Sequence, residues 1–224
     1  MITLAFDTAM NAGSVAVADD EAVLAHLVEP NSRSLAERLV PMVEEALAIA
    51  GQSYQTIDRM GVTVGPGTFT GMRIGMAAAR AMALAAEKPL IGATTLEVIA
   101  QQAADEYLAE NTINVCFDAR RGEVYLQTFV RQDGELLPKR APVLCSVDAA
   151  ATEMSAASGL LVGSGAPLMG TPLGLLIAPG FEVIGALTLA QLVGRRPVPE
   201  HMPDPLYLRA PDAKLPGGKT LASS

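Results

Sequence analysis

Apolar and polar positions in the first hundred residues follow two different periods. Short apolar or alternating runs bounded by Asn, Asp and Gly have the period of strands, and apolar residues that recur every three or four positions have the period of helices. The strand period marks five segments: 2–6, 13–19, 21–28, 59–64 and 89–94. The helix period marks three segments: 34–50, 74–87 and 96–108. This order predicts an α/β unit that begins with a meander of three strands.

The helix expected over 34–50 carries its own start and stop signals. Ser34 is followed three residues later by Glu37, which is the spacing of a capping box. Gly51 follows the last apolar position, as at many helix C-termini. Pro41 lies inside the helix and removes one backbone hydrogen bond, so we expect a kink there.

The second half of the chain repeats the pattern of the first. A strand ends in an acid at Asp7 and again at Asp118, and each acid is followed by a short loop and two further strands. The run GVTVGPG at 61–67 has a counterpart in GLLVGSG at 159–165, after a helix expected over 147–157. Matches in the same order indicate a duplicated unit of three meandering strands, a helix and a strand.

A duplicated unit of this kind is how the ribonuclease-H-like fold begins, and two copies face to face make the actin-like (ASKHA) architecture of sugar kinases and Hsp70. We therefore predict two mixed-sheet subdomains flanking a cleft. Residues 1–108 would form the first and 109–224 the second. A short late helix is expected over 187–193. The Pro-rich tail from Pro197 is expected to be extended and to pack back over the first subdomain.

Composition and charge exclude some classes of function. The formal net charge is −8, aromatic residues are 4%, Trp is absent, and Lys and Arg are scattered along the chain. A protein that grips nucleic acid by itself usually carries a basic face with aromatic residues, so any contact with RNA is expected to run through a partner. No apolar run approaches the ~20 residues of a membrane span, and an acid follows the N-terminus at Asp7, so we expect a cytoplasmic protein without a signal peptide. Cys116 and Cys145 are expected to be free thiols.

Two turns carry candidate chemistry, and each has a purely structural alternative. In nucleotide-binding members of this architecture an acid at the position of Asp7 holds a metal while a Gly-rich hairpin cradles phosphate; here Ala9 replaces a Gly, and Asp7 could equally cap a loop. The stretch GPGTFTGMRIG at 65–75 places glycines, hydroxyls and a cation at a strand-to-helix turn, which suits an anion or simply a tight turn. The weak anion-site candidates are Asp7, Gly65, Gly67, Thr68 and Gly71.

Nothing in the sequence predicts a catalytic residue, a cofactor or a metal ion. His26 and His201 are the only histidines, and they form no metal-spaced pair and no part of a Ser–His–Asp arrangement. Both are expected at the surface or at a sheet edge.

The stretch at 65–75 closely resembles the signature of the TsaB (YeaZ) family. The likeness continues in order through LAFDTA, RLVPM, IGATTLE, DARRGEVY and PLYLR, at 4–9, 38–42, 91–97, 118–125 and 205–209. One departure is Leu35-Ala36, where the family often has His followed by Ser or Thr, so no role of that His carries over. The catalytic relative TsaD carries a His-x-x-x-His metal motif that this chain lacks.

The resemblance implies a non-catalytic scaffold and activator subunit of the tRNA threonylcarbamoyladenosine (t6A) complex. Its partners would be a TsaD-like transferase and a TsaE-like ATPase, with a homodimer when the chain is alone. Two alternatives remain: an independent small ATPase or phosphotransferase, and a structural protein that only self-associates.

The helix expected over 74–87 is apolar on nearly every side and rich in small residues, so several of its faces must be covered. Either the helix is central in its own domain, or it also meets a partner, as the resemblance implies. The residues expected at such an interface are Leu39, Met42, Arg73, Met76, Ala77, Ala78, Arg80, Ala81 and Leu84.

Overall fold

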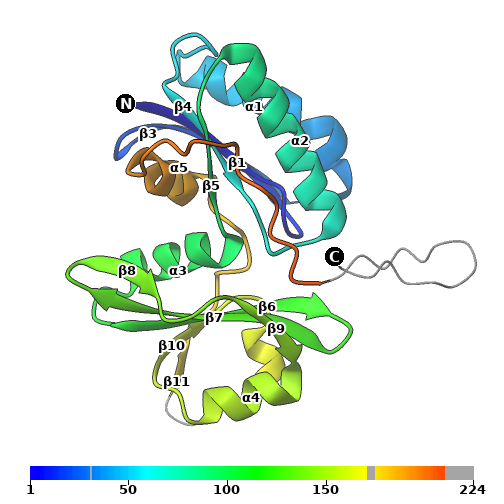
Figure 1. Ribbon diagram of the computed structural model, residues 1–224, viewed down its shortest axis with the longest axis vertical. Helices are drawn as coiled ribbons and strands as arrows, with labels where there is room; N and C mark the ends of the chain where they lie inside the picture. Colours follow the sequence, from blue (N-terminus) through cyan, green and yellow to red (C-terminus); the bar gives the residue numbers. More distant parts are fainter. Residues whose placement is uncertain (31, 171–174, 210–224) are drawn as a thin grey trace, which may run out of the picture.

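The computed structural model describes residues 1–30, 32–170 and 175–209, which form two lobes stacked along the long axis (Figure 1). The strands are β1 (Ile2–Asp7), β2 (Gly13–Asp19), β3 (Ala22–Glu29), β4 (Arg59–Thr63), β5 (Leu90–Ala93), β6 (Thr112–Arg120), β7 (Glu123–Gln132), β8 (Glu135–Pro138), β9 (Val143–Ser146), β10 (Gly159–Val162) and β11 (Leu175–Ile177). The helices are α1 (Leu35–Ile49), α2 (Phe69–Ala86), α3 (Thr95–Glu106), α4 (Val147–Ser155) and α5 (Ala186–Gly194), with 3-10 turns η1 (Ser32–Ser34) and η2 (Ala166–Met169).

The two sheets have the same topology, which confirms the duplicated unit. The first has the order β3-β2-β1-β4-β5 and the second the order β8-β7-β6-β10-β11, with β9 also paired to β7. In each, three consecutive strands form an antiparallel meander, and two more strands, β4 and β5 or β10 and β11, extend the sheet parallel to the first strand of that meander. Both sheets are therefore mixed, as predicted.

The helices form alternating layers with the sheets. Helices α1 and α2 cover the outer face of the first sheet, and α4 covers the outer face of the second (Figure 1). Alternation along β1 explains this: Leu4 and Phe6 face α1 and α2, whereas Ala5 faces the inner layer. Helices α3 and α5 fill that inner layer between the sheets.

The two inner helices are exchanged between the halves of the chain. Helix α3 comes from the first half but packs on the second sheet, and α5 comes from the second half but packs on the first. First-sheet side chains fasten both ends of α5: the Ser14 hydroxyl donates to Ile184 O (2.7 Å) and accepts from Ala186 N (3.0 Å). At the other end, the Arg59 guanidinium donates to the carbonyls of Val193 (3.0 Å) and Arg196 (2.7 Å). Each sheet is thus completed by a helix from the other side of the expected boundary at residue 108.

Two local predictions were wrong, and two short strands were missed. Helix α2 begins at Phe69 instead of residue 74, because Thr68 caps it by accepting a hydrogen bond from the Gly71 N–H. Ser34 makes no capping hydrogen bond; the capping box lies at Thr94 and Glu97, at the start of α3. The short strands β9 and β11 were not predicted.

Other local signals were right. Gly51 has a φ of +63° and ends α1, with Gln52 N donating to Leu47 O (2.9 Å) as in a Schellman motif. His26 on the edge strand β3 and His201 in the tail are both exposed, as predicted.

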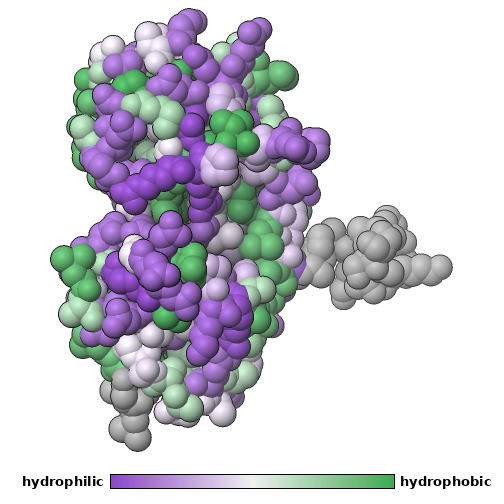
Figure 2. Space-filling view, turned by 60° about the vertical axis from the view of Figure 1, so that its left-hand side comes forward, coloured by the Kyte–Doolittle hydropathy of each residue, from purple (hydrophilic) through white to green (hydrophobic). Residues whose placement is uncertain are grey.

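The lobes meet at a waist bordered by hydrophilic residues (Figure 2). Among the described helices, none has the length and apolar character needed to cross a bilayer.

Candidate functional site: two acid turns and the cleft between them

The first acid turn follows β1 and is buried. Asp7 is 1% exposed, and its Oδ1 accepts hydrogen bonds from the Thr63 hydroxyl on β4 and from the Ala9 N–H (3.1 Å). Burial raises the pKa of Asp7 to about 7, and the two hydrogen bonds offset only part of that effect.

The glycine-rich stretch packs the start of α2 directly onto this turn. A Cβ on Gly71 would lie 2.0 Å from Thr8 O, and one on Gly67 would lie 2.4 Å from Ala9 O. The Thr8 hydroxyl donates to Gly71 O (2.7 Å), so the contact is also hydrogen-bonded. Only glycine permits this approach, which accounts for both residues by packing alone.

The remaining anion-site candidates are held in the same contacts. Thr68 donates its N–H to Ala9 O (2.7 Å) and accepts from Gly71 N (3.1 Å). Gly65 has a φ of +103°, and a Cβ there would meet Leu206 O at 2.9 Å. The structure thus brings Asp7, Gly65, Gly67, Thr68 and Gly71 together, with the glycines packed closely against Thr8, Ala9 and Leu206.

The second acid turn follows β6 and is open. The Asp118 side chain is 22% exposed, and it forms an ion pair with Arg120 (3.1 Å). Asp118 Oδ1 also accepts the Arg120 N–H (2.7 Å), and Asp118 N donates to the Ser164 hydroxyl (3.2 Å). Arg120, Arg121 and Gly122 come next with φ of 65°, 61° and 73°, so three consecutive residues are left-handed.

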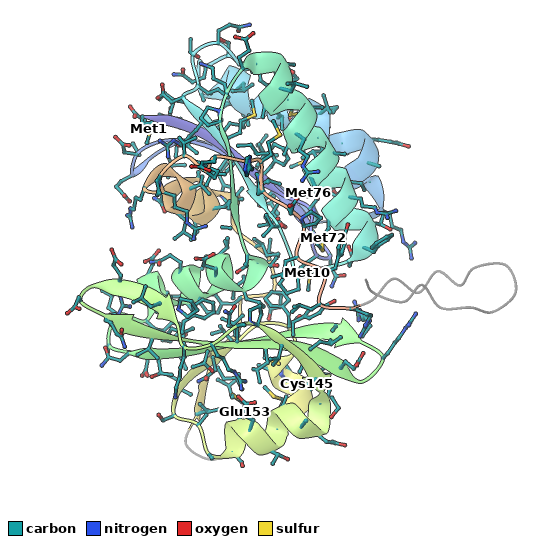
Figure 3. All side chains as sticks on the ribbon, in the orientation of Figure 1. Met1, Met10, Met72, Met76, Cys145 and Glu153 are labelled. Atoms are coloured by element: carbon teal, nitrogen blue, oxygen red, sulfur yellow. The ribbon has the colours of Figure 1, made fainter. Side chains whose placement is uncertain are left out.

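A cavity of about 450 Å³ lies between the two turns. One wall is the beginning of α2 with Thr68 and Phe69, and the opposite wall is the second turn from Asp118 to Arg121. Met10 and Met72, labelled in Figure 3, contribute an apolar floor near the junction of the lobes.

The tail closes one side of this cavity with residues 206–209. Leu206 N donates to Val64 O (2.7 Å), which anchors the tail to the first lobe. Arg209 donates to Ala119 O (2.9 Å) and forms an ion pair with Glu123, which anchors it to the second lobe. Sequence reasoning found the PLYLR block only as part of the family resemblance and gave it no place at the cleft.

The residues predicted at a partner interface fall into two groups. Leu39, Met42 and Met76 are at most 5% exposed and belong to the core between α1, α2 and the first sheet. These three residues therefore lie in the core and are not part of the surface. Arg73, Ala77, Ala81 and Leu84 are exposed and spaced along one face of α2; Ala78 and Arg80 are half-buried, and Arg80 donates to Pro203 O (2.8 Å).

Within the described residues, no group of three or more His, Cys, Asp and Glu side chains has the spacing of a metal site. Cys116 and Cys145 are free, and burial raises the pKa of the Cys116 thiol to about 12, so it is an unreactive core residue.

Two stacked lobes with duplicated mixed sheets and a cleft between matching acid turns define an actin-like, ribonuclease-H-like fold.

The model of the TsaD family, described as tRNA N6-adenosine threonylcarbamoyltransferase, matches residues 23–165. The tRNA threonylcarbamoyladenosine biosynthesis protein TsaB of Escherichia coli is 35% identical over 97% of this chain and 99% of its own length. TsaB of Haemophilus influenzae is 33% identical over 72% of this chain and 71% of its own length. YeaZ from Pseudomonas aeruginosa, a solved structure, covers 86% of this chain and 90% of its own at 28% identity, with a TM-score of 0.74. The chain belongs to the TsaB (YeaZ) family.

Proposed function

We propose that this chain is a non-catalytic subunit of the machinery that places threonylcarbamoyl on tRNA. It pairs with a TsaD-like transferase, and a TsaE-like ATPase joins the pair. The names of the TsaB relatives and the match to the TsaD family model support the pathway. The non-catalytic role rests on the geometry of the first acid turn.

The single observation that carries this role is the closed packing of α2 on that turn. Gly67 and Gly71 lie directly against the carbonyl oxygens of Ala9 and Thr8, where even a Cβ would come within 2.4 and 2.0 Å, so no ligand fits between α2 and this side of the turn. The carboxyl that would hold its metal, Asp7, is buried and accepts hydrogen bonds from Thr63 and Ala9. The turn therefore supports the fold instead of binding a nucleoside triphosphate.

The partner surface that we propose is the exposed face of α2. Arg73, Ala77, Ala81 and Leu84 succeed one another at helical spacing, and Leu84 is 72% exposed. Small side chains let a partner helix approach closely. A homodimer formed through the same face would compete with the TsaD-like partner.

Reconstitution tests the role. The chain is combined with the TsaD-like and TsaE-like proteins of the same organism, and threonylcarbamoyladenosine formation on tRNA is measured. We expect modification to require this chain, and we expect the isolated chain to release no phosphate from ATP above background. Phosphate release that Asp7→Ala abolishes would instead support the independent ATPase or phosphotransferase.

Charge insertion tests the surface. Ala77→Glu and Ala81→Glu should prevent co-elution with the TsaD-like protein in size-exclusion chromatography while circular dichroism stays unchanged. Ala149→Glu, at an exposed position near the start of α4, is the matched control and should co-elute normally. Normal pairing by both folded α2 variants would rule this surface out.

A further inference from the structure

The chain passes between the lobes at the two inner helices. It leaves the first sheet after β5 and enters the second lobe with α3, and it returns through residues 178–185 to α5 (Figure 1). Beside this return, the ring centres of Tyr107 and Phe181 lie 6.2 Å apart. The Gly185 N–H donates to Gln102 Oε1 on α3 (2.9 Å). These contacts hold the inner helices together, but their residues are not among those that line the cavity between the acid turns.

Between the acid turns the lobes face each other across that cavity of about 450 Å³. The start of α2 and the second acid turn form its opposite walls. Because the walls enclose a cavity, they are not packed against each other, and side-chain packing does not by itself fix their separation. Residues 206–209 of the tail, which we call the strap, connect the two walls.

The strap is short and is held at both ends. In the first lobe, Leu206 N donates to Val64 O (2.7 Å). In the second lobe, Arg209 donates to Ala119 O (2.9 Å) and forms an ion pair with Glu123. Three residues of extended chain span at most about 11 Å. The walls therefore cannot move far apart unless the contacts at one end of the strap break.

The first-lobe end of the strap is fixed by several residues. Just before the strap, Pro203 packs so closely on β5 that a Cβ on Gly92 would lie 2.8 Å from its ring. Arg80 on α2 donates to Pro203 O (2.8 Å) and forms an ion pair with Asp204 (2.9 Å). With the Leu206 N–H, these contacts hold the tail on β5, α2 and the end of β4.

The second-lobe end of the strap depends on one charged side chain. The Arg209 side chain is 24% exposed and that of its partner Glu123 is 38% exposed. Water competes for an ion pair at this exposure and salt screens it, so the pair contributes little to stability. Leu208 adds an apolar contact with the inner core. Of the two ends, the one at Arg209 therefore detaches more easily.

We propose that the strap is a releasable tie that sets the separation of the two cavity walls, with Arg209 as the end that detaches. While Arg209 holds Glu123, the second acid turn stays at one distance from the start of α2. When Arg209 detaches, the second lobe turns away from the first about the segments that join β5 to α3 and β11 to α5. The proposal does not rest on the proposed function, because both walls and the strap belong to this chain.

The separation of the walls is measured on the full chain by double electron–electron resonance. Spin labels are attached at Thr70→Cys, an exposed position in the first turn of α2, and at Ala149→Cys near the start of α4. The first N–H of α4 donates to Gly122 O (3.0 Å), so the second label follows the second acid turn. The background is Cys145→Ser, and Cys116 stays unlabelled because burial raises the pKa of its thiol. An excess of unlabelled chain removes distances between copies.

Two variants release the strap from opposite ends. Arg209→Ala removes the contacts with Ala119 and Glu123. Leu206→Pro removes the N–H that donates to Val64 O. Each should shift the distance distribution to longer and broader values. Because the two anchors hold one strap in series, the double variant should shift the distribution no further than the larger of the two single shifts.

Arg195→Ala is the matched control. Its partner Glu21 belongs to the same lobe, and both side chains are 63% exposed. The substitution removes an exposed arginine ion pair without touching the strap, so the distance distribution should stay that of the unmodified chain.

The proposal fails if Arg209→Ala, folded by circular dichroism, keeps the distribution of the unmodified chain, or if Arg195→Ala shifts it as much as Arg209→Ala does. It also fails if the double variant shifts the distance by the sum of the two single shifts, since two independent contacts would then act in place of one strap. If Leu206→Pro does not fold, Arg209→Ala and its control still decide. None of these results bears on pairing with a TsaD-like protein, which the reconstitution tests separately.

Discussion

The two acid turns share one local hydrogen bond, but the first turn is buried and the second is open. In both, the carboxylate accepts the N–H two residues on: Ala9 to Asp7 at 3.1 Å, and Arg120 to Asp118 at 2.7 Å. Yet Asp7 is sealed in the core, whereas Asp118 is partly exposed beside a cation. The similar sequences of the two turns do not predict this difference in burial.

The difference comes from the element that follows the parallel strand beside each meander, which is β4 in the first unit and β10 in the second. After β4, the glycines of 65–75 start the 18-residue helix α2, which packs its first turn on Thr8 and Ala9. After β10, the matching Gly163 and Gly165 lead only into η2, a four-residue 3-10 helix. A duplicated unit has therefore become a structural turn in one copy and an open, charged turn in the other, according to the element packed on it.

The largest test of this contrast is the pH dependence of stability. The pKa of Asp7 is about 7 in the folded chain against 3.8 in the unfolded chain, so the folded state binds more protons between these values. Stability from this group is present below about pH 4 and is lost as pH rises through 7, by about 4 kcal/mol. Asp7→Asn cannot ionise and should remove the decline, measured by urea unfolding between pH 4 and 8.

Asp118→Asn is the control from the other copy. It breaks a partly exposed ion pair with Arg120, which is worth about 1 kcal/mol or less. The decline that Asp7 causes should persist in this variant. A decline of unchanged size in Asp7→Asn would show that other groups cause it and that burial does not raise the pKa of Asp7.

A smaller effect tests how closely α2 packs on the first acid turn. A Cβ on Gly75 would lie 2.5 Å from the Thr8 hydroxyl oxygen but 3.8 Å from Thr8 Cβ. Gly75→Ala should therefore cost about 1–3 kcal/mol through overpacking, although Ala favours a helix. In a Thr8→Ala background the same substitution should become neutral or stabilising, because the oxygen is gone.

Denaturant unfolding of the two single variants and the double variant measures this coupling. If Gly75→Ala lowers the free energy of unfolding equally in both backgrounds, α2 is not in tight contact with the first turn.

The sequence supports the fold better than it supports the site. Strand and helix periods, together with the repeat, were enough to predict both mixed sheets. They were not enough to place α3 and α5, since an apolar stripe does not say which sheet it will cover. The start of α2 was missed because Gly71 looks like a turn residue, whereas it is a helical residue at a close contact.

The set of residues around the cavity between the acid turns could not be predicted from the sequence for a related reason. Its members, Phe69, Arg120 and Tyr207, are far apart along the chain and carry no shared spacing. The packing of the two lobes brings Phe69 and Arg120 to one cavity, and the tail, which contacts both lobes, adds Tyr207. The same folding leaves Leu39 and Met42 in the core, although their apolar character alone fitted a partner surface equally well.

The smallest expected effect compares the same exchange at matching positions of the two turns. Arg120 is left-handed, with a φ of 65°, and Ala9 is not among the described residues with positive φ. Arg120→Gly should therefore be more stable than Arg120→Ala by about 1 kcal/mol, since both lose the same ion pair and only Ala keeps the strain. Ala9→Gly should have the opposite sign and cost about 1 kcal/mol, because Gly loses more backbone entropy and a buried methyl group. Urea midpoints with unchanged slopes measure both differences. If Gly were favoured over Ala at both positions, the first turn would be as strained as the second, and the contrast between a packed structural turn and a strained, open one would have to be abandoned.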